Sequence, residues 1–417
     1  MALTAITNDF EVPKSLAELL LESSACKADF PVAITPAFDN MGRPNFLDAN
    51  GQPVAGVFAD VPNDDYHAIP AVSSSKLKTF AKTPAHYKRA YLDSICRART
   101  NAYKRTMDTG SHGHTLILEP ELFYGMYQRD LNPLDYPNAI SKVDELKAEL
   151  KSRGLKTSGL RADLIARLHE AAPEVAIFDV LQKNHRDEFI KSQFDNIIET
   201  DAELLETAKL IGVSTEGKRD EIVEAILAKE PSVNIYEKCV EARCIDPIVW
   251  DDAHRILESK KRNPLMELAI KDGMAELTVI AKCKITGMWL KVKFDWLRFD
   301  MIAVDVKTSG VTASPDGFAR QAANLRYDLQ ESFYTYVPSL LGIDIKAFAF
   351  AVVEYGEADI AEMYELDQRA KYKATKDLYY FLEEMKDCID NDTWYGYTNP
   401  ADGLQCTVLS LPAYHYK

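Results

Sequence analysis

Charged side chains end two of the apolar segments in the stretch 276–308. Asp295 closes one alternating segment, while Asp305 and Lys307 lie two residues apart at the end of the next apolar run. Because alternate residues of a strand point to the same side, Asp305 and Lys307 should leave one face of a sheet. Two carboxylates beside an ammonium suit a divalent cation such as Mg²⁺, with the lysine holding or helping to deprotonate a water. The alternative is an ordinary surface ion pair, since so short a pattern recurs by chance.

The apolar pattern of the same region predicts the elements that must position these residues. Ser314 and Pro315 favour the start of a helix, which residues at helical spacing continue to about Pro338. Within this helix Gln330 and Tyr334 are four residues apart and therefore lie on one face. A strand after the helix predicts a parallel pair with a right-handed crossover. Strands are expected at 277–281, 289–294, 301–306 and 345–353.

Three motifs of this region resemble those of a known superfamily. They read F-D at 294–295, D-V-K at 305–307 and Q-E-S-F-Y at 330–334. They are similar to the PD-(D/E)XK nucleases and to the Q-x-x-x-Y element of their recombination exonucleases. Phe294 stands where proline is usual, but the carboxylate that follows is kept. The resemblance implies an α/β core in which helices flank a mixed sheet.

Motifs earlier in the chain narrow the resemblance. YHAIPAVSSSKL begins at Tyr66, TPAHY begins at Thr83, and MDTGSHGHTLILEP occupies 107–120. In this order, and with the later motifs at similar spacing, they resemble the RecE-type exonuclease VIII family. The likeness covers about 66–135 and 231–417.

The resemblance also implies roles for individual residues. The histidine of G-x-x-x-H becomes a metal ligand, which favours His114 over its rival His112; a histidine that only packs in a helix core is the alternative. Glu276 either positions a water or is a solvated strand-end acid. Mg²⁺ is the implied ion, and Mn²⁺ is expected to replace it. The implied metal ligands are His114, Asp295, Asp305 and the Val306 carbonyl, and the implied catalytic residues are Lys307, Asp305, Asp295, Glu276, Gln330 and Tyr334.

Length and composition set the wider bounds. The 417 residues, 47% of them hydrophobic, allow two or three domains with full cores. Seven cysteines without a C-x-x-C pair disfavour a disulfide framework, a zinc ribbon or an iron–sulfur cluster. No segment has the apolar length of a membrane helix, and the first residues do not resemble a signal peptide. We therefore expect a soluble, cytoplasmic protein that has no membrane partner.

A net charge of −15 argues against indiscriminate binding to nucleic acid, because a negative surface repels phosphate. The basic segment 76–105 is an exception, although such a run can also be a solvated helix face. Its bases are Lys76, Lys78, Lys82, Lys88, Arg89, Arg97, Arg99, Lys104 and Arg105, against the single acid Asp93. The residues expected to bind DNA are Lys76, Lys78, Lys82, Lys88 and Arg89, together with Lys151, Arg153, Lys156 and Arg320.

Residues 136–230 interrupt the family pattern and predict a helical insertion. The segment 146–168 resembles a SAP module, a small helical unit of DNA-associated proteins. A shift of 58 positions reveals a second copy. It aligns Gly154 with Gly212, Gly159 with Gly217 and Arg161 with Arg219. The first copy is richer in bases and the second in acids, so only the first is expected to bind phosphate; the second is expected to pack or to dock protein.

The expected function is a Mg²⁺-dependent deoxyribonuclease. The resemblance implies digestion of one strand of linear duplex DNA from its 5′ end, a single-stranded tail for an annealing recombinase, and a ring-shaped homo-oligomer. A structure-specific or restriction-like endonuclease is one alternative, and a non-catalytic DNA-binding protein is another. The predicted divisions are 1–65 without an assigned role, 66–135 and 231–417 as the nuclease core, and 136–230 as the SAP-like insertion.

Overall fold

The computed structural model divides the chain into two compact units. It describes residues 14–23, 25–93, 101–356, 358–399, 406, 408–412 and 415, without the side chains of 101–107. Glu119–His254 forms one unit, and the described residues before and after it form the other. We call them the helical unit and the sheet unit.

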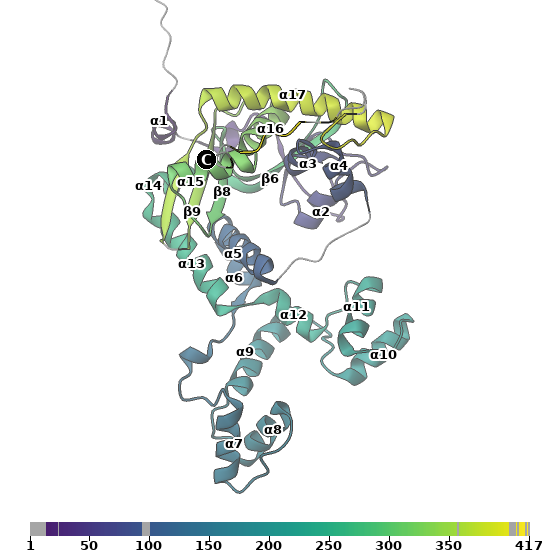
Figure 1. Cartoon of the computed structure of the whole chain (residues 1–417), viewed down its shortest axis with the longest axis vertical. Helices are drawn as coiled ribbons and strands as arrows, with labels where there is room; N and C mark the ends of the chain where they lie inside the picture. The colour runs from purple at the N-terminus through teal and green to yellow at the C-terminus, as the bar shows by residue number, and fades with distance from the viewer. Residues whose placement is uncertain are drawn as a thin grey trace, which may run out of the picture. The chain divides into compact units, whose positions relative to one another are not determined.

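The sheet unit is built on one mixed sheet (Figure 1). Its strand order is β1-β2-β6-β7-β8-β9-β10, and β3 also pairs with β7. The pairs β6–β7 and β7–β8 are antiparallel, whereas β8 and β9 are parallel, as the predicted helical crossover requires. The strands are β1 (Ile34–Pro36), β2 (Gly56–Ala59), β3 (Val72–Ser73), β6 (Gly273–Lys282), β7 (Trp289–Arg298), β8 (Ile302–Ser309), β9 (Ala347–Glu354) and β10 (Ile360–Tyr364).

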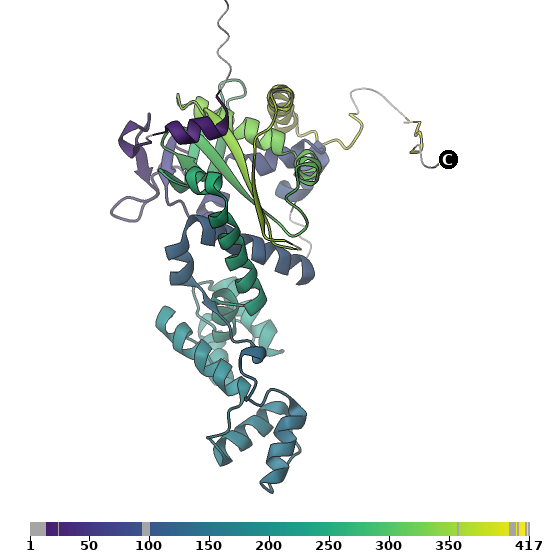
Figure 2. The same ribbon diagram turned by 90° about the vertical axis from the view of Figure 1, so that its left-hand side faces the viewer.

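Helices cover both faces of this sheet, so the predicted α/β class is confirmed. Figure 2 shows α16 and α17 on one side of the strands and α1 on the other. One core joins Phe333 and Leu378 to the sheet, and a second joins Leu16 to Val304. The helices are α1 (Leu16–Glu22), α2 (Asn63–Ala68), α3 (Ser74–Phe80), α4 (Pro84–Tyr87), α5 (Asn101–Leu118), α14 (Pro264–Ala269), α15 (Pro315–Asn324), α16 (Tyr327–Ser339) and α17 (Gln368–Asn391), while α13 (Pro247–Arg262) crosses the boundary between the units.

The single helix predicted from Ser314 to about Pro338 is wrong, because the structure has two helices. Ser314 caps α15 as expected, but Arg326 adopts a left-handed backbone conformation with φ of 52° and separates α15 from α16. The Arg326 side chain binds Asp328 and Asp377, which holds this break against α17. Gln330 therefore lies at the end of the first turn of a new helix, and Tyr334 lies one turn further on.

Residues of the segment 1–65, for which no role was predicted, extend the sheet. β1 pairs in parallel with β2, and β2 pairs in antiparallel register with β6. Val57 and Phe58 of β2 are buried, as expected for a strand that carries apolar residues into the core.

The helical unit contains the two predicted copies, and their backbones match. Arg161 binds Asp179 and the Ser141 carbonyl, and Arg219 binds Glu237 and the Glu199 carbonyl at the positions shifted by 58. Gly154 and Gly212 share a left-handed conformation, with φ of 70° and 69°. The elements are α6 (Pro120–Met126), β4 (Gln128–Arg129), α7 (Val143–Ser152), α8 (Arg161–Ala171), α9 (Phe178–Gln193), α10 (Asp201–Ile211), α11 (Arg219–Lys229), α12 (Tyr236–Arg243) and β5 (Cys244–Ile245).

The helical unit is wider than the predicted insertion 136–230. β4 pairs with β5, and Arg129 binds Asp251, so chain on both sides of the two copies belongs to the same unit. Arg186 on α9 also binds the buried Asp130. Patterns within the copies could not reveal these long-range contacts.

Candidate active site

Three carboxylates occupy neighbouring positions on strands β6, β7 and β8. The ladder between β7 and β8 stops one position short of Asp295 and Asp305, which would be the next opposed pair. The register between β6 and β7 pairs the residues on either side of Glu276 and Asp295, which leaves these two facing each other without a ladder pair of their own. Asp295 therefore lies inside β7 and does not close it, and Glu276 lies inside β6 with φ of 52°. Opposed like charges destabilise a sheet, so this row needs compensating cations.

His114 supplies one of these partners. Its Nε2 lies 3.0 Å from Asp295 Oδ2, and its Nδ1 lies 4.0 Å from Glu276 Oε1. The Val306 N–H donates to the same Asp295 oxygen at 2.8 Å. Lys293 lies 3.2 Å from Glu276 on the other side. His114 on α5 and the Val306 N–H on β8 thus hold the Asp295 carboxylate in place on β7.

Gly110 explains how α5 brings His114 to the sheet. A Cβ atom at Gly110 would lie 2.9 Å from Thr308 Oγ1 on β8, closer than ordinary side chains approach. The glycine of G-x-x-x-H thus permits the close packing that places His114, one helical turn later, beside Asp295. His112 is not among the residues whose ligand atoms converge at this place, and burial lowers its pKa.

Asp305 and Lys307 lie together, as the two-residue spacing predicted. Asp305 is 3% exposed, and its Oδ2 contacts the Lys307 ammonium but accepts no hydrogen bond of normal geometry. Its Oδ1 accepts a hydrogen bond of 2.7 Å from Gln330 Nε2. Tyr334, one turn after Gln330, donates to the Lys293 carbonyl at 2.9 Å and so braces β7 beside Asp295.

Burial and neighbouring charges shift the pKa values of this cluster. Burial alone would lower the pKa of His114, but the Asp295 carboxylate outweighs it and raises the pKa to about 8. Burial opposes the charge on Lys307 too, yet Asp305 raises the pKa of that ammonium. Burial raises the pKa of Asp305, and the nearby Asp295 charge adds to the effect. These surroundings thus favour the charged form of Lys307 and disfavour the charged form of Asp305.

This donor set fits a divalent metal ion. Ligand atoms of His114, Glu276 and Asp295 all lie within 4.8 Å of one another. An imidazole and carboxylates are suitable ligands for Mn²⁺ and, through oxygen, for Mg²⁺. Asp305 is not in this converging set, because its Oδ2 pairs with the Lys307 ammonium, so Asp305 stays a predicted ligand. Glu276, predicted either to position a water or to be a solvated strand-end acid, belongs to the converging set. The Val306 carbonyl stays a predicted ligand.

Lys78 takes part in the site in a way the sequence did not indicate. We expected it to be a DNA-binding base of segment 76–105, but its Nζ donates to Gln330 Oε1 at 2.9 Å. Burial lowers the pKa of Lys78 to about 8, and Lys307 adds to the effect. Lys76 is half-buried and donates to the Ala71 carbonyl. The helical spacing of α3 could not show which of its bases point inward.

The other predicted DNA-binding residues have more open surroundings. Arg97 and Arg99 of the basic segment lie outside the described residues, and the side chains of Lys104 and Arg105 do so as well. Lys88 is half-buried, and Arg89 is exposed but lies 3.9 Å from Asp93. In the first copy, Arg153 binds Glu149 and Glu174 although it is exposed. The remaining bases Lys82, Lys151, Lys156 and Arg320 are exposed.

Comparison with known families supports the sequence prediction for both units. Residues 224–407 match the family described as "PDDEXK-like domain of unknown function (DUF3799)", and residues 141–171 match the SAP domain. The chain thus carries a PD-(D/E)XK-like domain with a SAP module, and a match of this kind supports a nuclease. The narrower resemblance to the RecE type stays a prediction.

Two solved structures show a remote similarity. A "Putative exonuclease" from Eubacterium rectale is 13% identical with a TM-score of 0.30, over 50% of this chain and 84% of that one. SSO0001 is also 13% identical, with a TM-score of 0.20, over 50% and 92% of the two chains. Scores this low carry no argument about this protein. No curated protein matches the chain.

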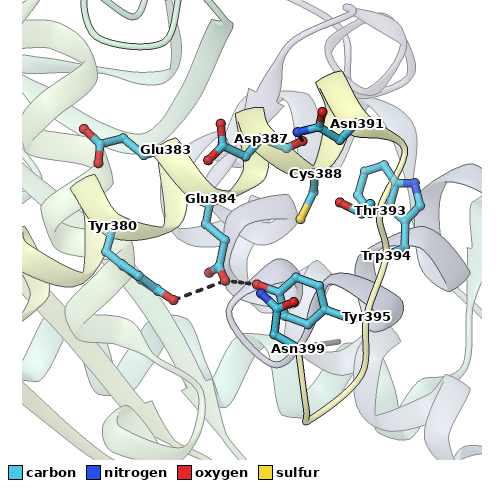
Figure 3. A pocket seen from close by; sticks show the side chains of 10 residues that line it. All are labelled: Tyr380, Glu383, Glu384, Asp387, Cys388, Asn391, Thr393, Trp394, Tyr395 and Asn399. Carbon is cyan, nitrogen blue, oxygen red and sulfur yellow. Dashed lines mark hydrogen bonds between the residues drawn. The ribbon is translucent and has the colours of Figure 1, made fainter. Parts of the chain in front are cut away.

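A separate pocket of about 760 Å³ lies at the end of α17 and shares no residue with the carboxylate cluster. Figure 3 shows Glu384 between the hydroxyl groups of Tyr380 and Tyr395, which both donate to it. Trp394 stacks on Tyr87, so the residues directly after α17 pack on α4. Among the described residues, no helix is long and apolar enough to cross a membrane.

Proposed function

We propose that this protein is a divalent-metal-dependent deoxyribonuclease that hydrolyses duplex DNA from its ends. The observation that supports this most is the convergence of His114, Glu276 and Asp295 beside the Asp305–Lys307 pair. Phosphodiester hydrolysis needs an oriented water, a place for a metal ion and positive charge near the phosphate. In this proposal, residues on β6, β7, β8 and α5 would supply all three.

In this proposal each side chain has a defined task. His114, Asp295 and Asp305 would hold the ion, with Glu276 as a further ligand and the Val306 carbonyl as a predicted one. Mg²⁺ or Mn²⁺ supplies Lewis-acid activation of the phosphate and of a water when bound. The raised pKa of Lys307 keeps its ammonium charged. Lys307 would orient the attacking water and help to deprotonate it, and its ammonium would stabilise charge that develops on the phosphate.

Residues around the predicted metal ligands hold those ligands in position. Gln330 holds Asp305 through one hydrogen bond, and Tyr334 holds the β7 backbone through another. Both come from α16, which packs on the sheet and is anchored to α17 by Arg326. The exposed bases of α15 and of the first copy would contact the DNA backbone, where lysine and arginine contribute affinity without reading sequence.

The finer assignment follows the RecE-type resemblance. It comprises digestion of the 5′-terminated strand, delivery of the single-stranded product to an annealing recombinase, and a ring-shaped homo-oligomer that encloses DNA. An acidic monomer holds a duplex weakly, whereas copies arranged around a basic channel bind it by enclosure. A multimer of the 46.9 kDa chain in sedimentation supports the ring, and a monomer contradicts it.

Metal dependence tests the proposal. Linear duplex DNA should be hydrolysed with Mg²⁺ or Mn²⁺ and stay intact with EDTA. Ca²⁺ should support binding without turnover, because it tolerates looser coordination than octahedral Mg²⁺. Equal hydrolysis in EDTA would contradict a metal mechanism.

A further inference from the structure

Lys78 reaches the site from α3, far from the other catalytic motifs in the sequence. Its ammonium donates to Gln330 Oε1 at 2.9 Å and lies 5.4 Å from the centre of the Tyr327 ring. Lys307 lies 5.0 Å from the same ring centre. Two ammonium groups thus share one aromatic ring, but only Lys307 forms an ion pair with Asp305.

The chemistry of the two groups fixes the orientation of Gln330. An ammonium can only donate hydrogen bonds, so it requires the oxygen of a side-chain amide. With Oε1 held by Lys78, the Nε2 group must point the other way, where it donates to Asp305 Oδ1 at 2.7 Å. A flipped amide would place its oxygen against a carboxylate and its NH₂ group against an ammonium. Lys78 excludes that orientation.

From this chain of contacts we propose that Lys78 is a positioning residue, which locks the Gln330 amide so that one oxygen of Asp305 is always hydrogen-bonded and the other faces Lys307 and the metal site. The inference rests on the proposed nuclease function. It replaces the expectation that Lys78 belongs to a solvated DNA-binding face. Lys78 acts through Gln330 and need not touch the substrate.

A purely structural role accounts poorly for a lysine at this place. Lys78 is half-buried, and even partial removal of an ammonium from water is costly, whereas an apolar side chain of similar length would pack on Tyr327 without that cost. Burial lowers the pKa of Lys78 to about 8, as this cost requires. The hydrogen bond to Gln330 compensates part of the cost, because bonds to charged groups are stronger than neutral ones.

Lys78→Met tests the role, since methionine keeps the length and removes the charge. We expect kcat to fall about 10- to 100-fold, the range seen when groups that orient metal ligands are lost, with KM and duplex binding in Ca²⁺ nearly unchanged. Lys78→Arg should recover much of kcat, because a guanidinium also only donates. Lys284→Met, at an exposed lysine on the β6–β7 connection, is the control and should leave kcat unchanged. A rise in KM with kcat unchanged would overturn the proposal in favour of substrate binding by Lys78.

A double-mutant cycle with Gln330→Ala separates action through Gln330 from direct action. Lys78→Met should lower kcat less than about 3-fold in the Gln330→Ala background, because residues that act through one another are not additive. Full additivity would overturn the inference. The same four proteins unfolded in urea give a second cycle that needs no turnover: coupled midpoints are expected, and additive midpoints contradict the Lys78–Gln330 contact. Absence of activity in the wild type would instead refute the proposed function, and the urea cycle would still decide the inference.

Discussion

The carboxylate cluster of the sheet unit and the bases of the first copy use charge in opposite ways. Asp305 is buried and the carboxylates beside it, Asp295 and Glu276, are half-buried on neighbouring strands, where each has a fixed partner. Lys151 and Lys156 are exposed on a small helical module, where solvent screens them. Low exposure makes loss of a partner in the first group costly in free energy and fixes the geometry of each side chain. Each exposed base of the second group can be substituted with a small loss of binding free energy. We therefore expect all-or-none effects at the first site and graded effects at the second.

The largest effect is expected from Asp305→Ala and Lys307→Ala. Each should lower the hydrolysis rate by about 10³-fold or more, because a preorganised charge at the reacting phosphate is lost. Circular dichroism should show folded proteins, and release of acid-soluble nucleotide measures the rate. Lys284→Ala changes an exposed lysine on the β6–β7 connection and serves as the control. Wild-type rates in Lys307→Ala would remove Lys307 from the mechanism.

The histidine assignment predicts the next largest effect. His114→Ala should lower activity about 100-fold or more, since even loss of groups behind metal ligands costs 10- to 100-fold. His112→Ala should stay within about 3-fold of wild type, because its ring is not among the converging ligand atoms. Titration with Mn²⁺ should show weaker binding in His114→Ala alone. The reverse ranking of the two variants would make His112 the ligand.

A graded effect is expected in the first copy. Changing Lys151, Arg153 and Lys156 to alanine together should reduce the dependence of log K on log salt concentration by roughly 2 to 3, if each base contacts one phosphate. Arg153 should contribute least, because Glu149 and Glu174 already bind it. Lys209→Ala with Lys218→Ala in the second copy is the matched control. An unchanged slope in the triple variant would make the first copy a protein-docking module.

The smallest expected effect is on the pH dependence of stability, and it comes from a buried carboxyl group outside the site. Glu331 is buried beside Lys371, and burial raises its pKa from 4.5 to about 7. A carboxyl with a raised folded pKa favours the folded state below the unfolded pKa, and this contribution is lost as pH rises from about 4.5 through 7. Glu331→Gln should therefore raise Tm relative to wild type by about 2 °C more at pH 8 than at pH 5. Glu362→Gln, at an exposed position, should show no such difference.

Local sequence patterns predicted β6, β7, β8 and β9, the strands at the centre of the sheet, whereas the single helix predicted between β8 and β9 is two helices. Alternation located β6 and β7, and the D-x-K spacing placed Asp305 beside Lys307, because both rest on the geometry of one strand. The 58-residue shift found two copies whose backbones match.

What the sequence could not show depends on contacts between distant segments. Gln330 binds both Lys78 and Asp305, which are 252 and 25 residues away. Periodicity places such residues on a face but does not say what that face meets. The break at Arg326 was missed for a similar reason, since its ion pair with Asp377 stabilises a conformation that local propensity does not favour.

The most direct test of the central claim compares linear and covalently closed circular duplex DNA of one sequence with the wild-type protein and Mg²⁺. We predict that the linear form is degraded, that the closed circle survives the same conditions, and that EDTA protects both. Degradation of closed circles as fast as linear DNA would contradict action from DNA ends and favour an endonuclease. No hydrolysis of either form with Mg²⁺ or Mn²⁺ would contradict the account of the His114, Asp295, Asp305 and Lys307 cluster as a nuclease site.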